Sequence, residues 1–215
     1  MHNRERFIYV MFSSTPSKIG KMIRTLTKHP YNHVSLCLNA DKMTVYSFAR
    51  IYKNHPFYGG FVKESTSRFM MDNHLTQVKL CAIPVSEEQY VHLTTVVQQM
   101  EQDADQYTYN HLSIIGGIFK KKVQVKNAYT CVEFTTNLLT KSNVLPQIDA
   151  HTFYDIEMLE QQLDCYTVYE GPFEQLHFKW NNHGDTFDAN QSYYTGMYLA
   201  FSANARLVYS FIRST

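Results

Sequence analysis

The segment AYTCVEFTTNLLTK, residues 128–141, contains the clearest helix start in this 215-residue sequence. Thr130 and Glu133 have the T-x-x-E spacing of a capping box, in which each side chain bonds to the other residue's backbone. Apolar residues then follow at the spacing of one helix face, namely Phe134, Leu138 and Leu139. The sequence therefore predicts a helix that begins at Cys131.

The position of Cys131 distinguishes it from the other three cysteines. The free N–H groups and partial positive charge of a helix start favour a thiolate, which is the nucleophilic form of cysteine. Cys37 and Cys81 lie within strand patterns and Cys165 begins a predicted strand, so all three are expected to be small buried residues. Cys131 is thus the candidate nucleophile.

A nucleophilic cysteine needs a base, and His33 is the strongest of the ten histidines. It begins the strand pattern of YNHVSLCL, residues 31–38, which is followed by a turn and by TVYSFA, residues 44–49. A turn centred near 40–41 would place Ser47 opposite His33 on the same face. Ser47 is therefore expected to orient the imidazole.

A metal site is the competing interpretation, because His29, His33 and Cys37 are spaced i, i+4, i+8. On one helix, these side chains would line up as ligands. Pro30 and the alternating pattern after it favour a strand instead, on which His33 and Cys37 would lie about 13 Å apart. The sequence predicts neither a metal nor a cofactor.

The remaining sequence predicts an α+β chain. Strands are expected at 7–12, 75–85 and 165–169, and helices at 16–28, 86–103, 109–119 and 152–162. Residues 50–73 show no clear period and are expected to form a long irregular segment.

Composition excludes several classes of protein. A formal net charge of +1 gives no reason to expect a nucleic-acid partner, and four cysteines without C-x-x-C pairs do not suit a disulfide scaffold. No apolar stretch approaches the roughly 20 residues of a membrane span. The apolar run at 7–12 is too short for a signal peptide, so a cytoplasmic protein is expected.

The order of these motifs resembles the circularly permuted papain-like cysteine hydrolases of the NlpC superfamily, the YiiX/YaeF-like group. The resemblance rests on YNHVSLCL, on VYSFAR with NHPFYGGFVKE, and on YTCVEFTTNLL. It implies an α+β fold in which the cysteine-bearing helix packs across a central antiparallel sheet. The hydrolase domain would span residues 1–175, and residues 176–215 would form a C-terminal extension packed on the same domain.

The resemblance also implies roles for individual residues. Cys131 matches the nucleophile and His33 the general base, while the third position falls at or near Ser47. The superfamily commonly has His, Glu, Asn or Gln there, and a serine orients the imidazole less strongly. Glu64 or a tyrosine is the alternative.

The implied function is that of a cysteine peptidase or amidase, acting through an acyl-enzyme on a small peptide or peptidoglycan-derived amide. An acyltransferase or lipid esterase on the same fold, and a non-catalytic binding protein, are the alternatives. The apolar C-terminal run GMYLAFSANARLVYSFI is expected to pack in the core or at an oligomer contact rather than on a membrane. The oligomeric state is left open.

Overall fold

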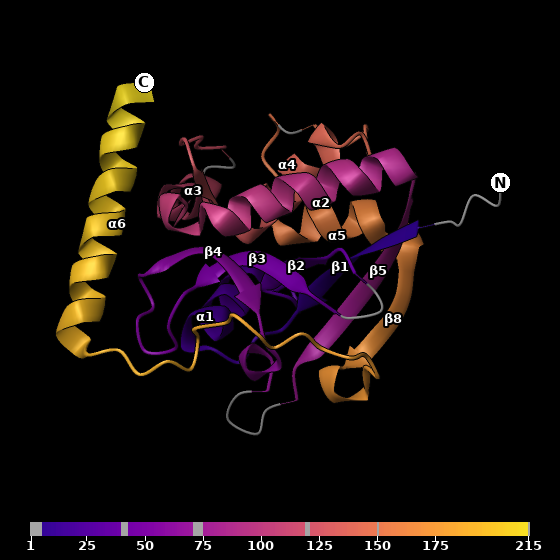
Figure 1. Ribbon diagram of the computed structural model, residues 1–215, viewed down its shortest axis with the longest axis horizontal. Helices are drawn as coiled ribbons and strands as arrows, with labels where there is room; N and C mark the ends of the chain where they lie inside the picture. The colour runs from indigo at the N-terminus through magenta and orange to yellow at the C-terminus, as the bar shows by residue number, and fades with distance from the viewer. Residues whose placement is uncertain (1–5, 40–42, 71–74, 119–120, 150, 215) are drawn as a thin grey trace.

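The computed structural model describes residues 6–39, 43–70, 75–118, 121–149 and 151–214. A six-stranded antiparallel sheet lies at its centre, with strand order β4-β3-β2-β1-β5-β8 (Figure 1). Its strands are β1 (Arg6–Ser13), β2 (His33–Cys37), β3 (Val45–Arg50), β4 (Gly59–Glu64), β5 (Gln77–Val85) and β8 (Thr167–Pro172). Two short parallel strands, β6 (Thr108–Tyr109) and β7 (Ala128–Tyr129), form a second sheet.

The helices account for most of the remaining chain. They are α1 (Lys18–Thr27), α2 (Glu87–Gln102), α3 (His111–Ile118), α4 (Cys131–Lys141), α5 (Ile156–Leu163) and α6 (Tyr193–Ser214). Single 3-10 turns are formed by η1 (Thr66–Arg68), η2 (Ala104–Gln106), η3 (Asp164–Tyr166) and η4 (Phe173–Gln175). The expected α+β class with a central antiparallel sheet is confirmed.

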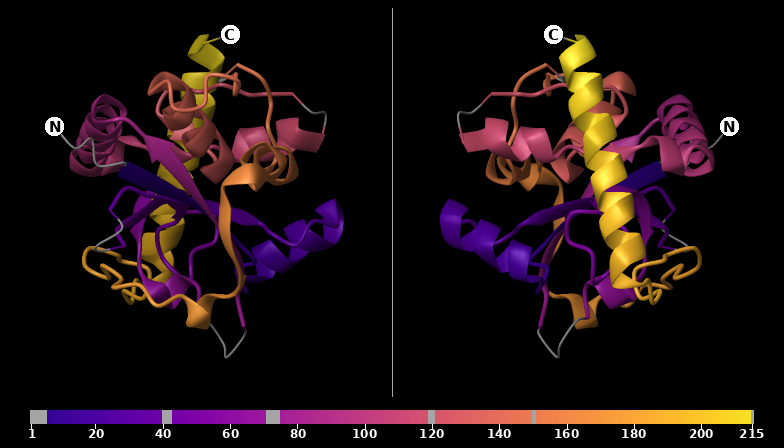
Figure 2. Two further views of the ribbon diagram at one scale, coloured as in Figure 1. Left: turned by 90° about the vertical axis from the view of Figure 1, so that its right-hand side faces the viewer. Right: turned by 90° about the vertical axis from the view of Figure 1, so that its left-hand side faces the viewer.

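The main core lies between one face of the sheet and the helices α2, α4 and α5, whereas α1 lies on the other side of the sheet (Figures 1 and 2). Phe134 of α4 packs against Phe48 of β3 and Phe61 of β4, with ring centroids 5.4 and 5.7 Å apart. Burial of these rings fixes α4 across the sheet, since each aromatic side chain removes a large apolar area from water.

The start of α4 is built as its sequence predicts. The Glu133 backbone N–H donates to Thr130 Oγ1 at 3.1 Å, and the Thr130 N–H donates to Glu133 Oε2 at 2.8 Å. Both bonds of the capping box are therefore present, and the helix begins at Cys131. Because the cap satisfies only some of the free N–H groups of the first turn, the helix start keeps its positive end near Cys131.

The prediction that residues 50–73 are irregular is wrong for β4, which pairs with β3 along its whole length. The strand begins with Gly59 and Gly60, residues that usually weaken a strand. A Cβ at Gly60 would lie 2.8 Å from the Tyr107 carbonyl oxygen, and one at Gly59 would lie 2.9 Å from Tyr109 Cβ. The glycines let the segment before α3 approach the sheet, so their cost as strand residues is offset by this contact.

The register of the predicted hairpin is also wrong. Cys37 pairs with Val45, and this register places Ser47 opposite Ser35 rather than opposite His33. The predicted turn falls on residues 40–42, which lie outside the described residues.

The strand predicted at 165–169 begins later, at Thr167, as β8. Cys165 lies in the turn η3 and is exposed, so the expectation that it is a buried strand residue is wrong.

The segment after β8 returns along the sheet and packs on it. Trp180 lies against Phe173 and Phe69, with centroids 5.0 and 5.9 Å away. Asp185 accepts two hydrogen bonds from the buried Arg68 guanidinium, at 2.7 and 2.6 Å. The chain then enters α6, which runs along one side of the molecule (Figure 1). Among the described residues, none of the helices is long and apolar enough to cross a membrane.

Candidate active site

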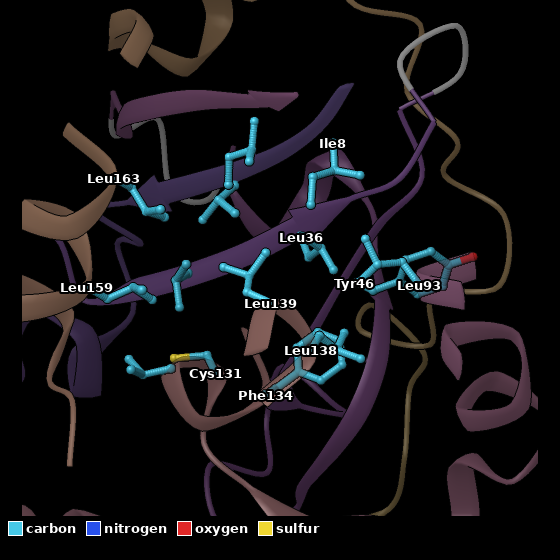
Figure 3. Close-up of a cluster of buried hydrophobic side chains, with 14 of the residues drawn as sticks. Ile8, Leu36, Tyr46, Leu93, Cys131, Phe134, Leu138, Leu139, Leu159 and Leu163 are labelled. Atoms are coloured by element: carbon cyan, nitrogen blue, oxygen red, sulfur yellow. The ribbon is translucent and has the colours of Figure 1, made fainter. Parts of the chain in front are cut away.

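Cys131 is the first residue of α4, and its side chain lies at the edge of the main core, where only 5% of the residue is exposed. Figure 3 shows its sulfur among buried side chains that include Phe134 and Leu138. The helix start supplies backbone N–H groups beside a nearly buried thiol. Free N–H groups of this kind can bind a developing oxyanion.

His33 and Glu64 form a buried pair that joins β2 to β4. His33 Nε2 lies 2.7 Å from Glu64 Oε1, and the two residues are 8% and 1% exposed. The other carboxylate oxygen of Glu64 accepts a hydrogen bond from the Ser35 hydroxyl. Two bonds thus hold the carboxylate, which in turn fixes the orientation of the imidazole.

The two members of this pair shift each other's pKa in opposite directions. Burial alone would lower the pKa of His33, but the charge of Glu64 and hydrogen bonds with Cys131 and Glu64 outweigh it and raise the pKa to about 10. Burial alone would raise the pKa of Glu64, but the charge of His33 outweighs it and lowers that pKa. The pair is therefore an imidazolium and a carboxylate at neutral pH.

Cys131 lies near His33, because α4 packs against β2 and the Cys131 side chain contributes to the raised pKa of His33. The bond from Nε2 to Glu64 leaves Nδ1 as the second ring nitrogen. The structure thus brings close together the two residues predicted from sequence, 98 positions apart. A cysteine, a histidine and a carboxylate are grouped at one place in the fold.

Ser47 does not take the predicted third position. Its hydroxyl, fully buried, donates to the carbonyl oxygen of Val34 at 3.0 Å, and the imidazole of His33 is bonded to Glu64 instead. The two-residue error in register removes Ser47 from the position opposite His33. Glu64, the alternative named from sequence, takes the role from β4, which lies on the other side of β3 from β2.

Tyr109 is a site residue that the sequence did not reveal. It ends β6, which runs parallel to β7, the strand that leads directly into Cys131. Burial raises the pKa of Tyr109 well above its usual value, and contacts with Cys131 and Glu133 raise it further. The phenol therefore remains a hydrogen-bond donor beside the thiol. Nothing in the sequence marks this tyrosine among sixteen.

A cleft of about 510 Å³ opens beside His33, Glu64 and Tyr109. Most of its wall is apolar, and the residues come from α1, from the loop before β4, from α3 and from the C-terminal segment. They include Met22, Ile23, Pro56, Phe57, Ile114 and Phe187. Phe48 and Phe57 also line this cleft, whereas Cys131 is not among its lining residues.

The other cysteines lie in different settings. Burial raises the pKa of Cys37 and of Cys81 to about 11, so both are thiols at neutral pH. Cys165 is exposed, away from any helix start of the kind that Cys131 occupies. Among the described residues, no group of three His, Cys, Asp or Glu side chains is placed to hold a metal ion.

A scan against protein-family models found no match to this chain, and searches of curated proteins and of solved structures found none either. The resemblance to the NlpC superfamily therefore remains a prediction from sequence motifs.

Proposed function

We propose that this protein is a cysteine hydrolase that forms an acyl-enzyme on Cys131, with a permuted papain-like arrangement of its site. The observation that carries the proposal is the buried His33–Glu64 pair on the sheet against which α4 packs, with Cys131 near His33 at the capped start of that helix. A nucleophile, a base and a group that orients the base are what thiol-dependent acyl transfer requires.

In the proposed resting state, His33 is the imidazolium because it already holds the proton of the Cys131 thiol. The thiolate of Cys131 attacks the carbonyl carbon of an amide or ester. The tetrahedral intermediate collapses as His33 gives the proton to the leaving amine or alcohol, which leaves a thioester on Cys131. Water then attacks the thioester and gives a proton to His33, and the second intermediate collapses to release the acid and restore the thiolate beside the imidazolium. Glu64 holds the ring of His33 throughout.

Tyr109 and the helix start are placed to bind the negative oxygen of the intermediate. The raised pKa of Tyr109 keeps its hydroxyl protonated beside Cys131, so it can donate a hydrogen bond. The free backbone N–H groups of the first turn of α4 are the second source of donors. Tyr109 would thus be a catalytic residue that touches the reacting atoms.

The resemblance favours a small peptide or a peptidoglycan-derived amide as the substrate. The cleft favours a second candidate, because Met22, Ile23 and Phe187 give it an apolar wall beside His33. Such a wall suits a substrate with an alkyl or aromatic acyl group, which is the substrate of an esterase or acyltransferase. Both candidate reactions proceed through an acyl-enzyme, and they differ in the acyl group that is transferred to Cys131.

Two measurements test the proposal. Iodoacetamide at neutral pH should label Cys131 faster than Cys37 or Cys81, with a Cys165→Ser variant removing the one exposed thiol from the comparison. Incubation with p-nitrophenyl esters of increasing chain length, followed by mass spectrometry, should find the acyl group on Cys131. Equal, slow labelling of every thiol and no acyl adduct would instead support a non-catalytic binding protein.

A further inference from the structure

The helix α6 presents a row of exposed apolar side chains on the face directed away from the rest of the molecule. Figure 2 (right) shows α6 running across the front of the protein, with no other segment drawn over it. Tyr194, Tyr198 and Phe201 are 83, 70 and 76% exposed, although exposed aromatic residues of this size are uncommon on a protein surface. The opposite face of α6 is anchored by Ala203 and Leu207, each 2% exposed.

The exposed row has the spacing of a coiled-coil seam. Its members are separated alternately by four and three positions: Tyr194, Tyr198, Phe201, Ala205, Val208 and Ile212. This 4-3 alternation over about 19 residues is the pattern by which one helix packs along another.

The order of side chains along the seam fits a second copy of α6 running in the opposite direction. With the two-fold axis near Ala203, Phe201 of one copy faces Ala205 of the other. Each pair of facing residues forms one layer of the interface, and the outer layers pair Tyr198 with Val208, and Tyr194 with Ile212. Each layer then combines one aromatic ring with one smaller side chain. A parallel pairing would place like residues together, with rings crowded at one end and a gap between the two Ala205 side chains.

The surface of α6 is hollowed where this arrangement needs a hole. A depression of about 360 Å³ surrounds Ala205 and is walled by Tyr198, Phe201 and Tyr209. In the antiparallel pair, it receives the ring of Phe201 from the other copy. Knob-into-hole contacts of this kind are the unit of coiled-coil packing.

The charges of α6 and its exposed apolar area are both compatible with self-association. The only charged residues of α6 are Arg206 and Arg213, which lie on neither seam position, and α6 contains no acidic residue. Like charges therefore do not oppose each other across the pair. The three aromatic residues of the seam, Tyr194, Tyr198 and Phe201, offer on the order of 450 Å² per copy before Met197, Val208 and Ile212 are added. A stable interface needs about 800 Å² per partner.

We propose that the protein forms a two-fold symmetric dimer through antiparallel pairing of α6, centred on the contact between Phe201 and Ala205. This interface is independent of the proposed catalysis, since the seam contains none of the residues of the cleft.

Sedimentation velocity of the full chain over a range of concentrations tests the dimer. The native protein should sediment as a dimer that dissociates on dilution. Phe201→Asp should weaken association at least about 100-fold, because the change counts twice in a symmetric dimer. Val91→Asp, an equivalent change at an exposed position of α2, should leave the dimer unchanged. Circular dichroism should find each variant folded.

A swap of the two central residues tests the direction of pairing. Ala205→Phe alone should weaken the dimer, since it places two rings in one layer. The double variant Phe201→Ala with Ala205→Phe should restore it, because each layer again combines a ring with a small side chain. Failure of the swap in a folded protein would overturn the antiparallel pair. A native protein that stays monomeric at millimolar concentration, or that binds phospholipid vesicles through α6 as a monomer, would overturn the dimer.

Discussion

Two histidine–glutamate pairs of the same length occur in this protein, and they differ in what surrounds them. His33 Nε2 lies 2.7 Å from Glu64, and His29 Nε2 lies 2.7 Å from Glu160. Glu160 also accepts a hydrogen bond from Lys79 Nζ at 2.7 Å. The permanent cation of Lys79 neutralises that carboxylate, whereas Glu64 depends mainly on His33.

The two pairs have the same histidine–glutamate distance, but the residues around each pair determine what it can do chemically. The pair of His33 lies beside a cysteine at a helix start and opens on an apolar cleft. The pair of His29 joins the segment before β2 to α5 and to β5, and Lys79 extends it to Asp164 at 2.6 Å. The second pair stabilises the packing of these segments against one another. A histidine–carboxylate pair therefore indicates a catalytic site only when a reactive group lies near the other ring nitrogen.

The largest effect is expected when His33 is replaced. His33→Ala should lower the rate of acylation of Cys131 by a p-nitrophenyl ester about 1,000-fold, because the thiol loses its base. His29→Ala is the matched control and should leave this rate within about twofold. Stopped-flow release of nitrophenolate measures both. Equal losses in the two variants would remove the distinction between the pairs.

Tyr109→Phe should lower the same acylation rate about 100-fold, which is the usual effect of removing one oxyanion donor. Alkylation of Cys131 by iodoacetamide produces no oxyanion, so that rate should change little. Tyr31→Phe, which removes a phenol bonded to Glu170 at 2.8 Å in the other region, is the control and should change neither rate. A parallel fall in acylation and alkylation would mean that Tyr109 acts on the thiol instead.

Glu64→Gln should change the pH dependence of alkylation. The charge of Glu64 is the largest influence that raises the pKa of His33 against the effect of burial, so this pKa should fall when the charge is removed. A neutral imidazole stabilises the thiolate less, and the rise of the alkylation rate with pH should therefore move to higher pH. At pH 7 the rate should fall about tenfold.

The matched variant Glu160→Gln should leave this profile in place and lower only the melting temperature. An unshifted profile in Glu64→Gln would contradict the assignment of Glu64 as the residue that positions His33.

The smallest effect is expected at Ser47, the residue that the sequence placed in the site. Ser47→Ala removes one buried hydrogen bond to Val34, so the free energy of unfolding should fall by about 1 kcal/mol. Alkylation of Cys131 should be unchanged, as measured by mass spectrometry over time. A tenfold slower reaction would restore Ser47 to the site.

The sequence was sufficient for the parts of the site that depend on local signals. The capping box of Thr130 and Glu133 located the start of α4, and the turn before YNHVSLCL located His33, because both signals lie within a few residues of the position they mark. The third residue depends on the register between strands, which is set by packing over the whole sheet. An error of two positions in that register placed Ser47 opposite His33, and the unrecognised strand β4 carries Glu64.

The strand β4 and the contact of Tyr109 could not be predicted for a related reason. Gly59 and Gly60 weaken the strand pattern, and the reason for them lies in the close approach of Tyr107 and Tyr109, some fifty positions later. Tyr109 reaches Cys131 only because β6 lies beside β7. Contacts between distant segments leave no periodicity that a single sequence can reveal.

The pairing of Arg68 with Asp185 has a consequence for the order in which the protein is made. During synthesis on a ribosome, the strand that carries Glu64 and the helix that carries Cys131 both emerge before Asp185. Until then, Arg68 is a cation without its main counterion, and its charge already acts on Glu64. A nascent chain is therefore expected to let Arg68 compete with His33 for Glu64. In the folded protein, Asp185 holds the Arg68 guanidinium in a salt bridge, and the imidazole is the group bonded to Glu64.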